Sequence, residues 1–291
     1  MKKLEIIFIV NPISGVGKQK KIETLVPEII DSSKINYKII YTQYAKHATE
    51  IATAYKDKTD VIVTVGGDGS VHETACALLN SNTALAIIPT GSGNGLARHL
   101  NIPLNIKKAI AVLNNFEIKK IDTGFINNIP FVNVAGIGFD AFIIEQFAKN
   151  TTRGLLSYIK IIVSSLPSFK AIDCEVKWKN GTFNDKAFMV CGANISQFGN
   201  AAYIAPTAKD TDSKLNLVII KKLNLFQIPM LSFRLFTKTI HKSKHVIYET
   251  VEEFSISQKT ENVQLDGEFY KINSPLHFKV NPLSLSVVVS K

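Results

Sequence analysis

Short, predominantly apolar runs that end at glycine-rich loops recur through the first 120 residues, and they constrain the fold more than any other feature. Strands are expected at residues 6–10, 37–41, 61–65 and 84–88. Helical spacing follows them at residues 20–30, 48–55, 71–79 and 94–100. Strands without a polar face, alternating with helices, predict a mainly parallel sheet covered by helices on both sides.

Beyond about residue 122 the pattern changes to shorter runs, several of which alternate apolar and polar residues. These predict strands at residues 131–134, 174–178, 186–190, 215–220, 253–258, 263–265, 276–280 and 285–289. Helical stretches are expected near 155–166 and 226–240. The pattern favours a second, mainly antiparallel β domain, hence two domains at 1–124 and 125–291. The last strand, expected at residues 285–289, could instead return to the first domain, and the sequence leaves this open.

The charge balance favours anionic partners. Lys and Arg number 34 and Asp and Glu 24, which gives a net charge of +10. Nucleotide phosphates, nucleic acid and an anionic membrane all suit this charge, but no basic platform with interleaved aromatic residues predicts nucleic-acid binding. No apolar run is long enough to span a membrane. Three widely spaced cysteines without a C-x-x-C pattern indicate buried thiols in a reducing cytoplasm.

The first loop that follows a strand resembles a phosphate-binding loop but departs from the Walker pattern. Pro12 stands where that pattern has its first glycine, and Gln19 stands where it has Ser or Thr. Backbone N–H groups before a helix can still bind phosphate. An ordinary strand-to-helix turn remains the alternative for residues 11–18.

Two further loops carry several glycines each. The second runs from Gly66 to Glu73 and holds Asp68, which suits Mg²⁺ coordination or the orientation of a phosphate loop. The third runs from Pro89 to Arg98. A capped tight turn is the alternative for the second loop. Because carboxyl ends of neighbouring parallel strands meet at one sheet edge, the two loops together predict a polyphosphate pocket.

These loops resemble those of the catalytic family of diacylglycerol and sphingosine kinases, which includes soluble bacterial lipid kinases. The resemblance continues along almost the whole chain, at residues 122–124, 136–141, 206–212 and 266–268. The double-glycine aspartate loop alone also occurs in NAD kinases and phosphofructokinases. The ordered set of motifs is much more specific than any one of them.

The resemblance implies a nucleotide-binding first domain, a lipid-acceptor second domain, ATP and Mg²⁺. It assigns ATP binding to Asn11, Pro12, Ser14, Gly15, Thr42, Gly66, Gly67, Asp68, Gly69, Ser70, Glu73, Thr90, Gly91, Ser92 and Asn94. Asp68 would work with Mg²⁺, and Glu268, with Asp266 beside it, would accept the proton of the lipid hydroxyl. A supporting charge network would comprise Arg98, Asp122 and Lys18. A structural Mg²⁺ would be held by Asp212 and by the carbonyls of Lys209 and Lys214.

Two departures bear on these assignments. Asn94 is followed by Gly95 where many bacterial diacylglycerol kinases have Asp, which is closer to sphingosine and ceramide kinases. Ser213 stands where the structural-metal loop usually has Gly. The acceptor therefore stays open between diacylglycerol and a sphingoid or ceramide lipid. An NAD kinase-like phosphotransferase and a non-catalytic lipid- or nucleotide-binding module remain the alternative functions.

Residues 224–245 predict a basic amphipathic helix, with large apolar residues at helical spacing from Phe226 to Ile240. No acidic residue occurs between Asp212 and Glu249. Such a helix can lie transiently on an anionic membrane or pack its apolar face on the β domain. We expect a cytoplasmic protein, with peripheral binding at the inner membrane face and a homodimer both left open.

Overall fold

The computed structural model describes residues 3–14, 21–149 and 155–291. The chain forms two compact units, residues 1–122 with 283–291 and residues 123–282. It passes between them inside two long strands, β5 (Phe116–Ile126) and β15 (Leu276–Ser290). The structure confirms the predicted fold class, a parallel α/β unit combined with a mainly antiparallel β unit. Within the described ranges, no helix is long and apolar enough to cross a bilayer.

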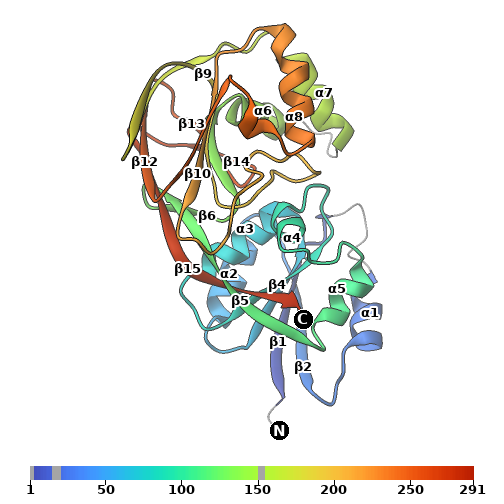
Figure 1. Ribbon diagram of the computed structural model, residues 1–291. Helices are drawn as coiled ribbons and strands as arrows, with labels where there is room; N and C mark the ends of the chain where they lie inside the picture. Colours follow the sequence, from blue (N-terminus) through green and yellow to red (C-terminus); the bar gives the residue numbers. More distant parts are fainter. Residues whose placement is uncertain (1–2, 15–20, 150–154) are drawn as a thin grey trace. The chain divides into compact units, whose positions relative to one another are not determined.

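The first unit is built on four parallel strands in the order β4–β3–β1–β2 (Figure 1). Their bounds are β1 Leu4–Val10, β2 Ile35–Tyr41, β3 Val61–Gly66 and β4 Ala84–Pro89. The end of β15 adds a fifth parallel strand, with Val287 opposite Leu85. All residues of β3 and β4 are buried, which explains why these strands lack an alternating pattern.

Helices cover both faces of this sheet. Those in the first unit are α1 Ile22–Ile29, α2 His47–Tyr55, α3 Asp68–Ala77, α4 Gly95–His99 and α5 Ile106–Val112. Phe8 and its same-face neighbours form one core with α1 and α5, while α2 and α3 contact the sheet strands from the other face. The composition of these strands therefore reflects burial on two sides.

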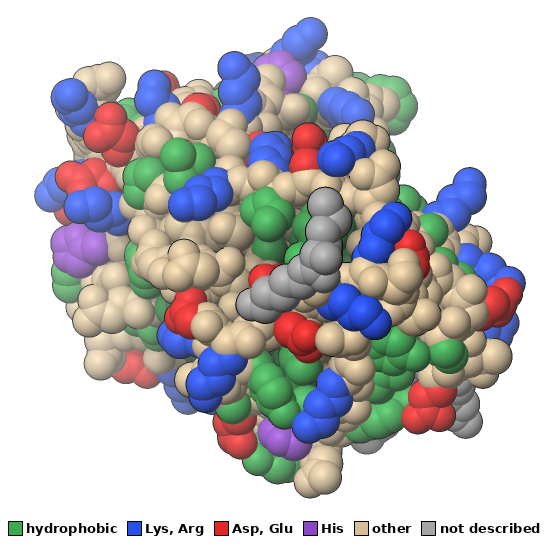
Figure 2. Space-filling view, turned by 90° about the horizontal axis from the view of Figure 1, so that it is seen from below, with side chains coloured by type: hydrophobic (Ala, Val, Ile, Leu, Met, Phe, Trp, Pro, Cys, Tyr) green, Lys and Arg blue, Asp and Glu red, His purple; other side chains and the backbone are tan. Residues whose placement is uncertain are grey.

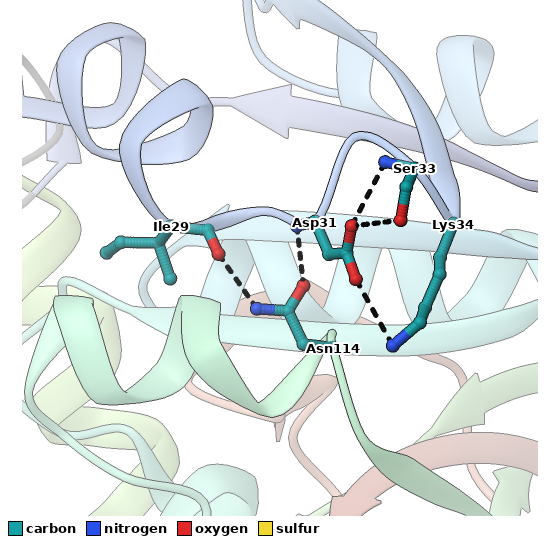
Figure 3. A network of polar contacts seen from close by, with 5 residues as sticks. All are labelled: Ile29, Asp31, Ser33, Lys34 and Asn114. Atoms are coloured by element: carbon teal, nitrogen blue, oxygen red, sulfur yellow. Dashed lines mark hydrogen bonds and ion pairs between the residues drawn. The ribbon is translucent and has the colours of Figure 1, made fainter.

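A polar network fixes the connection from α1 to β2 (Figure 3). The side chain of Asn114 accepts the Asp31 N–H at 2.9 Å and donates to the Ile29 carbonyl at 2.8 Å. The Asp31 carboxylate accepts the Ser33 N–H and lies 3.2 Å from the Lys34 ammonium group. The Ser33 hydrogen bond, more than Lys34, lowers the pKa of Asp31. Asn114 thus joins the α1 end of the turn to the segment after α5, and the Asp31 carboxylate holds the rest of the turn.

The second unit is mainly antiparallel. Its strands are β6 Ile129–Phe131, β7 Val134–Gly138, β8 Ile172–Trp178, β9 Gly181–Ala193, β10 Leu215–Lys221, β11 Val246–Val251, β12 Glu253–Gln258, β13 Asn262–Leu265 and β14 Glu268–Lys271. β9 pairs with β8, β7 and β10 along its length, all antiparallel. A buried cluster that includes Phe131, Phe254 and Phe278 forms its core.

The helices of the second unit are α6 Phe139–Lys149, α7 Leu155–Ser165 and α8 Ile228–Phe236. The helix predicted over residues 224–245 is wrong in its length, because the observed helix α8 covers only Ile228–Phe236. Short 3-10 turns at Leu225–Gln227 and Ile240–Lys242 flank α8, and the helix stops before Lys238, whose φ is +60°. Pro229 lies in its first turn, a position where proline needs no helical hydrogen bond.

Three predicted strands also differ from the structure. The strand expected over 131–134 is wrong, because β6 ends at Phe131 and β7 begins at Val134. The two strands expected at 276–280 and 285–289 are one strand, β15, which continues through Pro282. The Leu283 N–H after this proline donates to the Asp122 carboxylate at 2.7 Å rather than to a neighbouring backbone.

Candidate functional site

The second and third glycine loops of the first unit touch backbone to backbone. They follow β3 and β4, adjacent parallel strands with Gly66 opposite Pro89. A Cβ atom added to Gly91 would lie 2.6 Å from the Gly67 Cα, and one added to Gly67 would lie 3.3 Å from the Gly91 Cα. At Gly91 a Cβ would force the backbone to shift, whereas at Gly67 it would only make a tight contact. The structure therefore brings together the two loops that the sequence predicts to bind phosphate.

Asp68 joins the two loops electrostatically. Its two carboxylate oxygens accept the N–H groups of Asn94 at 2.8 Å and Gly95 at 2.7 Å. These are the first amides of α4, where a carboxylate also interacts favourably with the helix dipole. Asn94 itself adopts φ +52°, and its side chain donates to the Gly91 carbonyl at 2.8 Å. Asp68 therefore stabilises the first turn of α4, the helix that follows the third loop.

The first loop joins the same cluster through hydroxyl groups. The Asn11 amide donates to the Ser70 hydroxyl at 3.0 Å, and the Ser14 hydroxyl lies 3.0 Å from that of Thr90. The Ser14 N–H donates to the Asn11 carbonyl, which forms a tight turn. Three predicted segments are therefore connected side chain to side chain. Gly15 and Lys18 lie outside the described residues.

The remaining predicted nucleotide residues lie around this cluster. Thr42 follows β2, and its N–H donates to the Val10 carbonyl. Glu73 accepts the Lys46 N–H at 3.0 Å and so supports the start of α2. Arg98 donates to the Gly93 carbonyl at 2.9 Å, within its own loop. Pro12 lies in its expected loop, Gly69 lies in the first turn of α3, and the Ser92 side chain is exposed.

The donor set fits a nucleotide-bound Mg²⁺ better than a metal held by protein alone. Among the residues that the structure describes, no group of three or more His, Cys, Asp or Glu side chains could hold a metal ion. Mg²⁺ usually takes one or two carboxylates and completes its shell with phosphate oxygens and water. Asp68 is the carboxylate at the loop cluster. It also carries two backbone hydrogen bonds there, which the sequence does not reveal.

In the second unit, Glu268 is the first residue of β14, directly after a two-residue hairpin turn. Leu265 pairs with Glu268 across this turn, and its central residues Asp266 and Gly267 have φ of +52° and +87°. Positive φ at both positions is typical of the type I′ turn that Asp-Gly sequences favour. The Glu268 side chain is exposed. The structure therefore presents this carboxylate at the start of a strand, beside a tight turn.

Asp266, predicted to lie beside the base, has its carboxylate directed at the backbone. Its oxygens accept the N–H groups of Val132 at 2.8 Å, Asn133 at 2.7 Å and Val134 at 3.1 Å. Its own N–H donates to the Val134 carbonyl. The side chain is buried. These contacts explain the break between β6 and β7, and they show Asp266 fastening the turn to that segment.

Near the turn, a half-buried carboxyl group belongs to the predicted motif at 136–141. Asp140 lies in the first turn of α6 and accepts the Ala141 N–H at 2.8 Å and the Gln264 side-chain amide at 3.1 Å. Burial raises the pKa of Asp140 to about 7, against the lowering effect of these hydrogen bonds. Gln264 is absent from the sequence-based set of site residues. Its position two residues before Asp266, in a strand with apolar neighbours, is the signal that could have found it.

The predicted structural-metal loop precedes β10. The Asp212 carboxylate accepts the Lys214 N–H at 3.1 Å, and Ser213 has φ +57°, which favours glycine or asparagine. The neighbouring Thr207 hydroxyl lies 2.8 Å from the Tyr248 hydroxyl, and burial raises the pKa of Tyr248. Metal binding by Asp212, Lys209 and Lys214 stays a prediction.

Comparison with known proteins covers both units. A family model described as the diacylglycerol kinase catalytic domain matches residues 5–126. A second, described as the YegS C-terminal NAD kinase beta sandwich-like domain, matches residues 133–289. Diacylglycerol kinase from Staphylococcus haemolyticus is 30% identical over 276 residues, which cover 90% of this chain and 81% of that protein.

Two further relatives agree with this comparison. Diacylglycerol kinase from Bacillus subtilis is 28% identical, with 92% of this chain and 90% of that protein covered. A crystal structure of a diacylglycerol kinase from Bacillus anthracis has a TM-score of 0.79 to this fold at 21% identity, with 100% and 98% of the chains covered. At this identity the structural likeness concerns the fold alone.

Proposed function

Because the chain belongs to the diacylglycerol kinase family and is a lipid kinase, we propose that it transfers the γ-phosphoryl group of ATP, with Mg²⁺, to a hydroxyl group of diacylglycerol. The observation that carries the proposal is the backbone contact of two glycine loops joined by Asp68. Relatives named diacylglycerol kinase support this acceptor. A sphingoid or ceramide lipid is the second acceptor to test, because of Gly95 in the third loop.

The residues of the chain divide the chemistry between them. The glycine loops supply backbone N–H groups to phosphate oxygens at the carboxyl ends of β3 and β4. Asp68 would hold Mg²⁺ together with the nucleotide phosphates, and the ion would neutralise charge on the transferred group. Glu268 accepts the proton of the lipid hydroxyl as its oxygen bonds to the γ-phosphorus and the bond to the ADP oxygen breaks. Asp266 holds the turn that carries Glu268.

Transfer of labelled γ-phosphate from Mg·ATP to lipids in mixed micelles tests the proposal with the full-length chain. The acceptors are diacylglycerol, sphingosine and ceramide, each alone. Glu268→Gln should lower kcat by about 10²–10⁴-fold, the usual contribution of a general base. Glu261→Gln is the matched control, because Glu261 is an exposed glutamate of the same unit. Wild-type kcat in Glu268→Gln would remove Glu268 from the proposed role.

An NAD kinase-like activity is the second candidate, favoured by the description of the family model that matches residues 133–289. The same assay with NAD as the only acceptor distinguishes the two functions. Phosphorylation of NAD without transfer to any lipid would support this candidate against lipid phosphorylation. ATP binding without transfer to any acceptor would support a binding module.

We also propose that α8 and its flanking turns contact an anionic membrane surface. The apolar stripe is exposed: Phe226 is 95%, Met230 61%, Phe233 64% and Phe236 57% accessible. Only Leu231 within α8 is buried. The alternative, in which this stripe packs on the β domain, is therefore wrong for these four side chains.

Basic residues complement this apolar stripe. Exposed lysines flank α8 at positions 222, 238, 242 and 244. Each basic residue near an anionic surface contributes about 1 kcal/mol, and each buried Phe about 1.5–3 kcal/mol. On the face shown in Figure 2, by contrast, Lys and Arg are interspersed with Asp and Glu. The α8 region thus combines exposed apolar side chains with flanking lysines.

Sedimentation with vesicles tests the membrane contact. We expect the chain to bind phosphatidylglycerol-containing vesicles at low salt and phosphatidylcholine vesicles weakly. Phe226→Ser with Phe233→Ser should lower binding at least tenfold. Leu104→Ser with Ile118→Ser is the control, since both side chains are exposed in the first unit. Equal binding by the two double variants would contradict the proposal.

A further inference from the structure

Gln264 is a buried amide that contacts the turn before Glu268. Its side chain lies in β13, is 3% exposed and is flanked by buried Val263 and Leu265. The Gly267 N–H donates to its Oε1 atom at 3.1 Å. Its Nε2 atom donates to the Asp140 carboxylate at 3.1 Å. Since the Gly267 N–H can only donate, the amide oxygen must face the turn and the amide nitrogen must face Asp140.

The sheet register brings these groups together. β13 pairs with β7, and Gln264 lies opposite Gly136. A Cβ added to Gly136 would lie closest to the Val190 carbonyl and the Cys191 Cβ of the neighbouring strand β9, and 3.0 Å from the Asp140 Oδ2 atom, so glycine here leaves room both for β9 and for this carboxylate. The other carboxylate oxygen accepts the Ala141 N–H in the first turn of α6. Asp140 is thereby fixed to α6 and offers Gln264 a defined acceptor.

The Gln264 amide supplies a contact that packing does not provide. Apart from Gly267 itself and its two chain neighbours, no heavy atom in the described part of the chain lies within 4 Å of the position that a Cβ of Gly267 would take. Three backbone N–H groups hold the Asp266 carboxylate, but none of these hydrogen bonds involves Gly267, the second residue of the turn. The hydrogen bond from the Gly267 N–H to Gln264 therefore restrains the half of the turn that leads into Glu268.

We propose that Gln264 is a positioning residue for the transfer reaction: by linking Gly267 to Asp140, it sets the direction in which the chain leaves the turn and so places the Glu268 carboxylate. The inference rests on the proposed role of Glu268 as the base. A displacement of about 1 Å in a reacting group can cost about 10²-fold in rate. We expect Gln264→Leu to lower kcat by about 10- to 100-fold and to leave the KM for ATP unchanged.

Steady-state kinetics of the full-length chain with diacylglycerol micelles test this role. Gln258→Leu is the matched control, because Gln258 is a strand residue of the same unit. Gln264→Glu keeps an acceptor for the Gly267 N–H but brings a second carboxyl group to Asp140. At pH 6, where this pair can share a proton, it should retain several-fold more kcat than Gln264→Leu. In a Glu268→Gln background, Gln264→Leu should cause less than a threefold further loss, because the group that it positions is already inactive.

Two results would overturn the proposal: equal kcat losses in Gln264→Leu and Gln258→Leu, or a Gln264→Leu effect that multiplies fully with Glu268→Gln. Failure of the base assignment would appear separately, as wild-type kcat in Glu268→Gln alone. Amide hydrogen exchange then tests the turn independently of catalysis. The Gly267 N–H should exchange at least tenfold faster in Gln264→Leu and unchanged in Gln258→Leu, and an unchanged rate in both would refute the restraint.

Discussion

Asp68→Asn should destabilise the first unit even without nucleotide. Each Asp68 oxygen accepts one backbone N–H, from Asn94 or Gly95, and a hydrogen bond to a charged group contributes about 1.5–3 kcal/mol. Asparagine keeps one acceptor, while its NH₂ group faces the other N–H. Losing one charged hydrogen bond and weakening the second predicts a loss of about 2–4 kcal/mol in the free energy of unfolding.

The effect should concentrate at α4. This helix spans five residues, too few to persist without external contacts at its first amides. Urea unfolding followed by circular dichroism measures the free energy, and hydrogen exchange of peptides covering residues 89–101 locates the loss. Asp60→Asn is the control, because Asp60 accepts one backbone N–H, from Glu5, at an exposed position.

A free energy of unfolding within about 0.5 kcal/mol of the Asp60→Asn variant, with unchanged exchange at α4, would refute the reasoning. This stability measurement also decides how a loss of activity in Asp68→Asn is interpreted. If Asp68→Asn loosens α4, loss of activity in this variant is no evidence that Asp68 coordinates Mg²⁺. A shift in the Mg²⁺ concentration needed for half-maximal rate, at saturating ATP, is then the measurement that tests coordination.

Three further predictions concern the loops and the second unit. Gly91→Ala should weaken ATP binding more than tenfold and Gly67→Ala less than threefold, by titration calorimetry, because the added Cβ lies 2.6 Å and 3.3 Å from the opposite Cα. Asp266→Ala leaves three backbone N–H groups without their acceptor and should cost about 3–5 kcal/mol, measured by the fluorescence of Trp178, the only tryptophan. Asp140, whose pKa of about 7 lies above the ordinary 3.8, binds a proton in the folded chain that the unfolded chain has released between these pH values. Its stabilising contribution is therefore lost as pH rises through 7, so urea stability should fall more from pH 5 to pH 8 in the wild type than in Asp140→Asn, and equal pH dependence would contradict this.

The sheet of the first unit could be predicted because burial on both faces leaves a direct mark in the sequence. The runs ending at Val10, Val65 and Ile88 are almost wholly apolar, and each lies in an observed strand. The glycines at 67 and 91 follow these strands, and their spacing predicted two phosphate loops side by side. Local composition is sufficient here because the strand, the loop and the helix that carry each feature are contiguous.

Features that depend on distant partners could not be predicted in this way. The strand expected over 131–134 is interrupted because the N–H groups of Val132 and Asn133 donate to Asp266, which is more than 130 residues away. β15 continues through Pro282 because the next N–H finds its acceptor in Asp122. In both cases a carboxylate from a distant segment accepts the backbone N–H. The sequence around that N–H gives no indication of this partner.

Contacts with distant segments also change the roles of the acidic residues in the Gly66–Glu73 and Asp266–Glu268 motifs. The family resemblance assigns Asp68 and Asp266 to the reaction site, yet the carboxylate of each accepts backbone N–H groups from a separate segment. Glu268 is exposed at the start of a strand, and its direction depends on a turn fixed by Asp266 on one side and Gln264 on the other. A motif aspartate can therefore be essential for activity by holding a loop. Only measurements that separate stability, nucleotide affinity and kcat distinguish such a residue from one that touches the reacting atoms.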